Sequence, residues 1–406
     1  MHILVVTQYF WPENFRINDL VKGLISKGYK VTVLTGKPNY PKGKVYPEFS
    51  RNPSEYNVYE NCQVIRVPII ARGKGKIRLS INYIGFALSA SFFGLIKLRR
   101  LKFNSIFVFG PSPITVGLPA ILFRRIYKIP LIFWTLDLWP DSLKSVEAIR
   151  SKTIIFFVGW LVSFIYRGCD LILGQSKSFL PQLKKYSGHN RVKYFPGWAE
   201  EIFHKKPYFI TEKKIDTEKI NIMFAGNISN AQDFPAVLES IKILKNDNQI
   251  KWLFVGDGRL LNWFKDEIQK NNLSSSVSFL GSHPIERMPE FFSKADALLI
   301  TLKNEPIFAM TIPGKLQSYL MSGKPILAML NGEGADLIRN FGCGLVCNAG
   351  NSQSLANLVL QLKSMSLKER NIMGKKGLDL SFNEFNREVM LDRVESYLIE
   401  TKLEIT

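Results

Sequence analysis

The stretch EPIFAMTIPGKLQSYLMSGKPIL, residues 305–327, contains a loop, a helix and the start of a strand in succession. Thr311 is predicted to cap the helix, and Pro313 falls in its first turn, where a missing N–H costs nothing. Gly323 is expected to end the helix, and residues 326–329 to form a buried strand. This succession is typical of α/β folds.

The loop before this helix is also a candidate anion-binding site. It leaves several backbone N–H groups free at a helix N-terminus. Lys315 adds a positive charge in the first turn, where a lysine opposes the helix dipole unless an anion lies nearby. Two interpretations of the stretch remain open: a cradle for a diphosphate, or an ordinary capped helix with a solvated lysine.

Buried strands and amphipathic helices alternate along the rest of the chain, which predicts an α/β fold with parallel sheets. A chain of 406 residues corresponds to two or three domains. Residues 201–219 are polar and lack periodicity, so they are the predicted linker. We expect one domain over residues 1–200 and a second over 220–383. A terminal helix over 384–402 is long enough to cross back to the first domain.

The positive charge of the chain is confined to one half. Residues 1–200 hold 29 Lys and Arg against 10 Asp and Glu, whereas residues 201–406 hold 25 against 24. The basic half suits an anionic partner such as a membrane surface, a nucleic acid or a phosphorylated substrate. The neutral half suits a small ligand.

Two apolar helices are predicted in the basic half, over residues 79–96 and 154–166. The first is at the lower length limit for a membrane span and the second is shorter, so both are expected to be domain helices. Basic clusters flank the first, at 72–78 and 97–102. Such flanks favour contact with an anionic membrane surface, although a core helix with solvated ends has the same pattern.

The expected location follows from the cysteines and the N-terminus. The four cysteines are scattered and have no neighbouring histidines, which indicates free thiols in a reducing cytoplasm rather than a zinc site. The short apolar start does not resemble a signal peptide. We therefore expect a cytoplasmic protein, peripheral on the inner face of the cell membrane.

Two further segments of the basic half carry candidate site residues. Residues 36–63 form a long segment that mixes lysines with tyrosines. Loops of this size are usually functional, so the segment either cradles a phosphorylated, partly apolar acceptor or is a solvated loop. Asp137 directly follows a predicted strand, at the end where open α/β sheets bind ligands. A helix-capping aspartate is the alternative, and Asp141 could fill that role.

Seven short motifs occur in a fixed order over nearly the whole chain. They are TQYFWPENFRINDL, LTGKPNYPKGKVY, TLDLWPDS, FAGNISNAQ, LFVGDG, KADALLITL and TIPGKLQSYLMSGKP. Together they resemble the family 4 glycosyltransferases of the GT-B fold. The branch that they resemble most is bacterial and adds sugars, including N-acetyl-L-fucosamine, to O-antigen or capsule repeat units. The resemblance implies two Rossmann-like domains with parallel sheets, facing across a cleft.

The chain departs from the family pattern at three places. Most members hold the donor diphosphate with an Arg and a Lys after the first strand of the second domain, where this chain has Asn227 and Gln232. The ribose-binding glutamate of the family is replaced by Ser318, and a histidine by Leu136. With two cationic contacts missing, more of the diphosphate charge must fall on Lys315 and on backbone N–H groups.

The resemblance also implies a reaction and a set of residues. A sugar would pass from a UDP-sugar, with retention of configuration, to a saccharide carried on polyprenyl diphosphate. Asp137, Glu13 and Lys315 are the expected catalytic residues. The expected donor-binding residues are Gly226, Asn227, Gln232, Gly256, Asp257, Gly258, Ser282, His283, Thr311, Ile312, Pro313, Gly314, Lys315, Gln317 and Ser318. The expected acceptor-binding residues are Asn14, Arg16, Lys37, Asn39, Tyr40, Lys42 and Lys44. No Asp-x-Asp motif occurs, so neither a catalytic metal nor a cofactor is expected.

Three other functions share some of these features. A nucleotide-sugar 2-epimerase of similar fold needs several acid–base residues, and the chain has only four histidines. A nicotinamide oxidoreductase needs a third glycine after each G-x-G pair, where Leu261 and Leu337 stand. A non-catalytic membrane or nucleic-acid binder is motivated by the basic half, but the second α/β domain with its phosphate site disfavours it. No nucleic-acid partner is expected.

Overall fold

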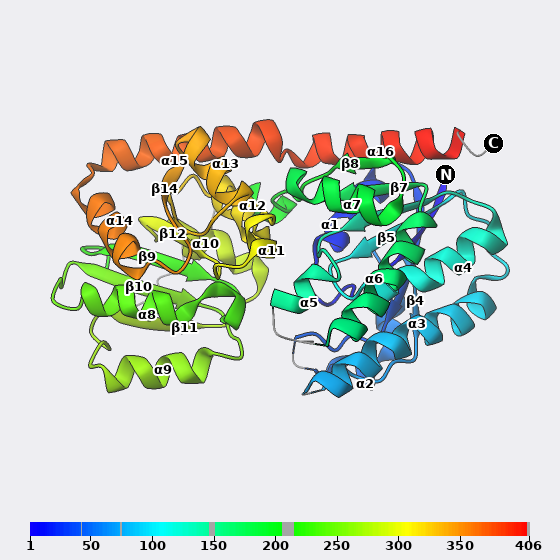
Figure 1. Ribbon diagram of the computed structural model, residues 1–406, viewed down its shortest axis with the longest axis horizontal. Helices are drawn as coiled ribbons and strands as arrows, with labels where there is room; N and C mark the ends of the chain where they lie inside the picture. Colours follow the sequence, from blue (N-terminus) through cyan, green and yellow to red (C-terminus); the bar gives the residue numbers. More distant parts are fainter. Residues whose placement is uncertain (42, 74, 146–150, 205–214, 404–406) are drawn as a thin grey trace. The chain divides into compact units, whose positions relative to one another are not determined.

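The chain divides into two compact units (Figure 1). Unit 1 comprises Met1–Pro196 and Glu388–Thr406, and unit 2 comprises Gly197–Arg387. The computed structural model describes residues 1–41, 43–73, 75–145, 151–204 and 215–403. The candidate acceptor residue Lys42 and positions 205–214 of the expected linker lie outside these ranges.

Unit 1 is built on an eight-stranded sheet in the order β3-β4-β2-β1-β5-β6-β7-β8. Neighbouring strands are parallel, except for the antiparallel pair of β3 and β4. The strands read as continuous apolar runs because helices cover both faces of a parallel sheet. The strands are β1 His2–Val6, β2 Lys30–Gly36, β3 Val58–Tyr59, β4 Cys62–Val67, β5 Ser105–Gly110, β6 Leu131–Thr135, β7 Leu171–Gly174 and β8 Val192–Tyr194.

The position of β1 locates the ligand end of this sheet. β1 pairs with β2 on one side and with β5 on the other, so the chain order reverses beside it. Ligands of open α/β sheets bind at such a switch point, beyond the carboxyl ends of the strands. The helices of the unit are α1 Arg16–Ser26, α2 Pro47–Arg51, α3 Lys76–Leu98, α4 Gly117–Tyr127, α5 Asp141–Ser145, α6 Lys152–Arg167, α7 Leu180–Ser187 and α16 Arg387–Leu403.

Helix α16 packs on α1, within unit 1. A Cβ built on Gly23 of α1 would lie 2.5 Å from Leu391 of α16, so the glycine permits a close approach of the two helices. Lys27 forms ion pairs with Asp392 and Glu395, and Tyr29 donates a hydrogen bond of 2.6 Å to Glu395. The expected terminal helix is thus present, although α15 ends at Glu384 and α16 begins only at Arg387.

Unit 2 contains a six-stranded parallel sheet in the order β11-β10-β9-β12-β13-β14. Its core is rich in aromatic residues, among them Phe224, Trp252 and Phe254. The strands are β9 Ile220–Ala225, β10 Ile250–Val255, β11 Val277–Gly281, β12 Ala297–Thr301, β13 Ile326–Met329 and β14 Gly344–Cys347. The helices are α8 Phe234–Ile243, α9 Leu261–Lys270, α10 Met288–Ser293, α11 Pro306–Ala309, α12 Gly314–Met321, α13 Glu333–Phe341, α14 Ser352–Ser364 and α15 Leu367–Glu384.

Candidate functional site

The glycines after β9 and β10 allow two loops of unit 2 to interlock. A Cβ on Gly256 would lie 2.0 Å from the carbonyl oxygen of Gly226, and a Cβ on Gly258 would lie 2.1 Å from that of Ile228. Gly226 and Gly256 also have positive φ values of 142° and 133°. These glycines are therefore required by backbone packing. The Oδ1 atom of Asp257 accepts a hydrogen bond of 2.7 Å from the N–H of Gly258, which holds the second loop.

Lys315 places a buried ammonium group beside the first of these loops. Its Nζ atom lies 3.6 Å from the centroid of the Phe224 ring, and a Cβ built on Gly226 would lie 3.3 Å from the same atom. Among the residues that the structure describes, Nζ has no hydrogen-bond partner. Burial lowers the pKa of Lys315 to about 7. A buried, unpartnered ammonium at a helix N-terminus is a site that an anion would complete.

The helix carrying Lys315 begins differently from the sequence-based expectation. Pro313 is the N-cap residue and α12 starts at Gly314. Thr311 does not cap the helix, because its hydroxyl donates a hydrogen bond of 2.8 Å to the carbonyl oxygen of Ile307 in the preceding turn. Ile312 and Pro313 are buried, so their side chains belong to the packing of unit 2 and not to a ligand surface.

Helix α12 is attached to the end of β9 by Tyr319, which is not among the residues expected to bind the donor. The hydroxyl group of Tyr319 accepts a hydrogen bond of 2.7 Å from the N–H of Ala225 and donates one of 3.0 Å to its carbonyl oxygen. Ser318, expected in the ribose site, donates its hydroxyl to the carbonyl oxygen of Lys315 instead. Gln317 is buried, and its Oε1 atom lacks a hydrogen-bond partner among the described residues.

Of the other expected donor-binding residues, some are exposed on loops and others form hydrogen bonds within unit 2. Asn227 and Ser282 are exposed on loops at the carboxyl ends of β9 and β11. Gln232 accepts a hydrogen bond of 2.5 Å from Ser229, which occupies its side-chain oxygen. Both ring nitrogens of His283 make internal hydrogen bonds, to Arg287 at 3.1 Å and to the carbonyl oxygen of Leu280 at 2.8 Å.

These contacts indicate the tautomer of His283. Arg287 can only donate, so Nδ1 of His283 is the acceptor, and Nε2 donates to the carbonyl oxygen of Leu280. Both ring nitrogens are thus bonded within the loop after β11, and the donor-binding role of His283 stays a prediction.

Glu13 of unit 1 connects the loops that follow β1 and β2, and it is 1% exposed. Its Oε1 atom accepts hydrogen bonds from the N–H groups of Asn39 at 2.8 Å and Tyr40 at 2.7 Å, and Oε2 accepts one from Phe10 at 3.2 Å. Burial raises the pKa of Glu13 to about 7, against these hydrogen bonds and the charge of Arg66, which lower it. Both carboxylate oxygens accept hydrogen bonds from backbone N–H groups, so Glu13 holds these loops together, and its catalytic role stays a prediction.

A cationic and aromatic cluster follows at the same edge of the sheet. The guanidinium carbon of Arg72 lies 5.4 Å from the ring centroid of Tyr40, and that ring lies 5.5 Å from Tyr9. Asn39 is fully buried, and its Oδ1 atom accepts a hydrogen bond of 3.1 Å from the N–H of Arg72. Among the described residues, no acidic side chain forms an ion pair with Arg72. Arg72 belongs to the basic cluster at 72–78 that is expected to face a membrane, but the folded loop directs it to Tyr40.

Asp137 lies just beyond β6, as expected. Its Oδ2 atom accepts a hydrogen bond of 3.2 Å from the indole N–H of Trp139, and the same N–H lies 3.2 Å from the hydroxyl oxygen of Ser112. The ring of Tyr83 lies 6.3 Å from that of Trp139. Burial raises the pKa of Asp137 to about 6, although hydrogen bonding to the carboxylate favours the charged form. A half-buried carboxylate with this pKa can exchange a proton near neutral pH.

The remaining acceptor candidates lie on the surface around this cluster. Asn14, Lys37 and Lys44 are exposed, whereas Arg16 is half-buried at the start of α1. Among the described residues, no group of three or more His, Cys, Asp or Glu side chains is arranged to hold a metal ion.

Comparisons with known proteins fit this geometry. Residues 206–379 match the family described as "Glycosyl transferases group 1". An alpha-monoglucosyldiacylglycerol synthase of Streptococcus pneumoniae is 24% identical over 293 residues, which are 69% of this chain and 62% of that protein. An uncharacterized glycosyltransferase of Methanocaldococcus jannaschii is 22% identical over 39% of this chain and 42% of its own length. The chain thus aligns with less than two thirds of either relative.

Solved structures are similar over almost the full length. Anabaena HepE in complex with UDP is 14% identical, has a TM-score of 0.69, and is matched over 98% of this chain and 100% of its own. The lipopolysaccharide glycosyltransferase WaaG is 13% identical, with a TM-score of 0.66 and coverage of 98% and 99%. The two units therefore have the α/β architecture of GT-B structures, and unit 2 contains the segment that matches group 1 glycosyl transferases.

Proposed function

We propose that this protein is a retaining glycosyltransferase that uses a UDP-sugar and a lipid-diphosphate-linked saccharide. The observation that carries the proposal is the buried ammonium group of Lys315 beside Gly226, for which the described part of the chain offers no hydrogen-bond partner. An isolated buried charge is costly unless a ligand of opposite charge binds to it. The diphosphate of a nucleotide sugar is such a ligand, and UDP is supported by the bound nucleotide named for Anabaena HepE.

The role of unit 2 is to bind the donor and stabilise the leaving group. When the bond between the anomeric carbon and the diphosphate breaks, negative charge develops on the diphosphate oxygens. Lys315 and the N–H groups at the start of α12 would stabilise that charge. They would replace the Arg and Lys of related enzymes, whose positions hold Asn227 and Gln232.

The role of unit 1 is to bind the acceptor. Arg72 has no acidic partner among the described residues, and it lies over Tyr40 at the ligand end of the sheet. An arginine over aromatic rings suits a phosphate attached to an apolar chain. The name of the pneumococcal relative, a glucosyldiacylglycerol synthase, supports a lipid acceptor. The sugar proposed from the resemblance is an N-acetylated amino sugar such as N-acetyl-L-fucosamine, added during capsule or O-antigen synthesis.

Asp137 supplies the acid–base chemistry of the proposal. The new bond forms between an acceptor hydroxyl oxygen and the anomeric carbon, while the bond to the diphosphate breaks. The hydroxyl proton has to leave in the same process, and an ionised carboxylate with a pKa of about 6 can accept it at neutral pH.

Acceptor-dependent release of UDP tests the proposal. The protein is incubated with a panel of UDP-sugars and with polyprenyl-diphosphate saccharides, and free UDP and the elongated lipid are measured. One UDP-sugar is expected to give both products in equal amounts, and only with acceptor present. Failure of UDP and of every UDP-sugar to bind at millimolar concentration would contradict the donor assignment.

Transfer is expected to proceed without a divalent ion, because the chain lacks an Asp-x-Asp motif and Lys315 can take the role of a charge-stabilising group. Activity measured in excess EDTA should equal activity in Mg²⁺. Loss of activity in EDTA and its recovery with Mn²⁺ or Mg²⁺ would show that a metal neutralises the diphosphate.

The proposed location is the inner face of the cell membrane, where a polyprenyl-linked acceptor is found. Among the described residues, one helix segment, Ile77–Leu98 of α3, is long and apolar enough to cross a membrane by length and composition alone. Phe86, Ala90 and Leu98 of this helix are buried. Its opposite side exposes a stripe at helical spacing, consisting of Ile77, Ile81, Ile84, Leu88 and Phe92. A helix packed on one side and apolar on the other suits the membrane interface.

Two members of the basic clusters beside α3 make contacts within unit 1. Arg72 is directed to Tyr40, and Lys97 donates a hydrogen bond of 2.9 Å to the carbonyl oxygen of Arg66. Lys74 lies outside the described residues. Arg78, Arg99, Arg100 and Lys102 are exposed, so their charge is available to an anionic surface.

A further inference from the structure

Helix α6 exposes a second apolar surface on the same layer as α3. Helix α4 contacts both α3 and α6, so the three helices lie in one row against the sheet (Figure 1). On α6, Phe156 is 72% exposed, Phe157 is 63% exposed and Trp160 is 65% exposed. Three large aromatic side chains within five residues are rarely left in water without a partner.

A pocket of about 470 Å³ opens beside Trp160, between α4 and α6. Its lining includes Arg124 and Arg125 of α4 and Trp160, Phe164 and Arg167 of α6. The pocket thus combines three guanidinium groups with an apolar wall. Its size is within the range of small-molecule sites.

Two of the three arginines are available to a ligand. Arg124 is neutralised by Asp170, with hydrogen bonds of 2.7 and 2.6 Å to the two carboxylate oxygens. Arg125 and Arg167 are exposed, and neither forms an ion pair with any of the described acidic residues. The carboxylate of Asp170 is already used by Arg124 and by the N–H of Leu131, so it cannot neutralise the other two.

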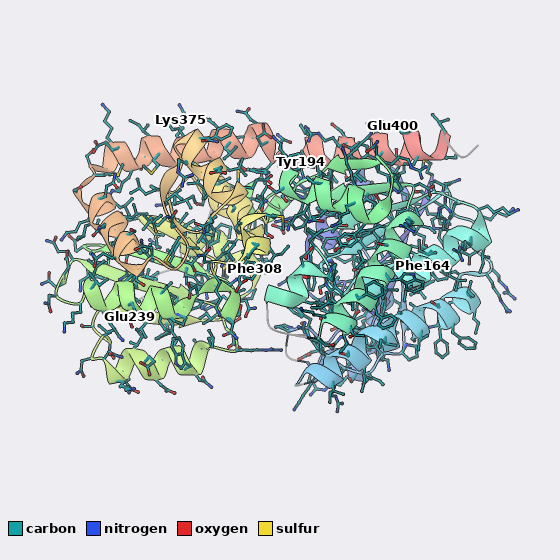
Figure 2. All side chains as sticks on the ribbon, in the orientation of Figure 1. Phe164, Tyr194, Glu239, Phe308, Lys375 and Glu400 are labelled. Atoms are coloured by element: carbon teal, nitrogen blue, oxygen red, sulfur yellow. The ribbon has the colours of Figure 1, made fainter. Side chains whose placement is uncertain are left out.

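Aromatic stacking fixes one of these free arginines in place. The rings of Trp160 and Phe164 are stacked, with centroids 6.0 Å apart and an interplanar angle of 17°. The guanidinium carbon of Arg125 lies 5.7 Å from the centroid of Phe164, whose position on α6 is labelled in Figure 2. The side chains of Trp160, Phe164 and Arg125 therefore lie in a row. The exposed indole ring is at one end, and the guanidinium group that packs on Phe164 is at the other.

We propose that this pocket binds the phosphate of an anionic phospholipid, with Arg125 and Arg167 as its ligands. The guanidinium group of arginine can donate two parallel hydrogen bonds to phosphate oxygens. The exposed rings of Trp160 and Phe157 would insert into the membrane interface around the same lipid. A free phosphate would leave the aromatic surface uncovered, whereas a bilayer covers it. This proposal rests on the proposed membrane location and adds a defined lipid-binding site to it.

Vesicle co-sedimentation of the full chain tests the site. Vesicles are made of phosphatidylcholine alone or with phosphatidylglycerol, and the variant is Arg125→Gln/Arg167→Gln. Binding of the wild type to anionic vesicles is expected to exceed binding of the variant by about tenfold or more, since each basic residue near an anionic surface contributes on the order of 1 kcal/mol. Binding to neutral vesicles should be equal for the two proteins.

The matched control is Lys184→Gln/Lys185→Gln, which removes two exposed charges from α7 of the same unit. It should lower binding only about twofold to threefold, because diffuse attraction is screened by salt. Equal losses for the two double variants would overturn the defined site in favour of unlocalised attraction. Displacement of the protein from vesicles by millimolar inorganic phosphate at constant ionic strength would identify a soluble phosphate as the ligand and also overturn it.

Two readouts separate this inference from the proposed function. Co-sedimentation needs neither donor nor acceptor, so a lipid site is detected even if no sugar is transferred. If transfer occurs, the arginine variant should retain the wild-type rate with a detergent-solubilised acceptor and lose rate only with acceptor in anionic vesicles. Circular dichroism and the melting temperature of each variant establish that the fold is intact.

Discussion

Replacing Asp137 by asparagine is expected to lower kcat about 10²–10⁴-fold, the usual contribution of a general base. The amide keeps the shape of the side chain, and its oxygen can still accept from Trp139, but it cannot take up the proton of the acceptor hydroxyl. The affinity for UDP should be unchanged, because donor binding is assigned to unit 2. Steady-state kinetics and UDP titration of the same preparation measure the two effects separately.

The pH profile gives an independent test of this role. Asp137 must be ionised to act as a base, and burial raises its pKa to about 6. The rate of the wild type should therefore rise with pH between about 5 and 7 and reach a plateau above, and the asparagine variant should lack that rise. Asp141→Asn in the same turn is the control and should keep the wild-type profile. A variant of Asp137 with wild-type kcat would assign the base to another group.

Replacing Lys315 by methionine is expected to reduce transition-state stabilisation by about 2–4 kcal/mol, the scale of a lost charge-stabilising donor. Methionine fills a similar volume over the Phe224 ring but cannot neutralise the diphosphate. kcat/KM measured with saturating acceptor should fall accordingly. Retention of kcat/KM within a few-fold of the wild type would contradict the assignment.

The same substitution should stabilise the ligand-free protein. In the folded state burial lowers the pKa of Lys315 from 10.5 to about 7, so the unfolded chain binds more protons between these pH values. The cost of the buried charge is complete below pH 7 and decreases as pH rises towards 10. The gain in melting temperature for the variant should follow the same course, being largest below pH 7.

Lys265→Met is a matched control for both effects. Lys265 also lies over a phenyl ring of unit 2, with Nζ 5.6 Å from the centroid of Phe279, but the residue is exposed on α9. Its replacement should change neither the kinetics nor the melting temperature appreciably. A gain in melting temperature as large as that of the Lys315 variant would mean that burial of the ammonium is not the cause.

The fold was predictable from the sequence because its strands are short, continuous apolar runs separated by amphipathic helices. The two parallel sheets and the long α3 follow from that pattern. Helix starts were less predictable: Thr311 has the chemistry of a cap, but the adjoining helix α11 supplies the carbonyl of Ile307 to its hydroxyl instead. Such competition between local partners depends on tertiary placement.

The site was predictable only in part, for a similar reason. Lys315 and Asp137 stand at strand or helix ends, where sequence position alone indicates ligand contact. Glu13 and His283 stand in equally suitable loops, but sequence position does not show that Glu13 bonds to backbone N–H groups, or that His283 bonds to Arg287 and to the carbonyl oxygen of Leu280. Arg72 was missed, since its contact with Tyr40 joins loops 32 residues apart in sequence and no spacing rule predicts it.

Titration calorimetry with UDP tests the central claim, that Lys315 binds the donor diphosphate, most directly. At pH 8 the phosphates of UDP are fully ionised, whereas Lys315, with a pKa of about 7, is mostly neutral in the free protein. Binding of the diphosphate should restore the charge on Nζ. Titrations in two buffers with different ionisation enthalpies should therefore report uptake of about one proton by the wild type and none by the Lys315→Met variant. Binding of UDP without proton uptake at pH 8, or with the same uptake in the variant, would contradict the account.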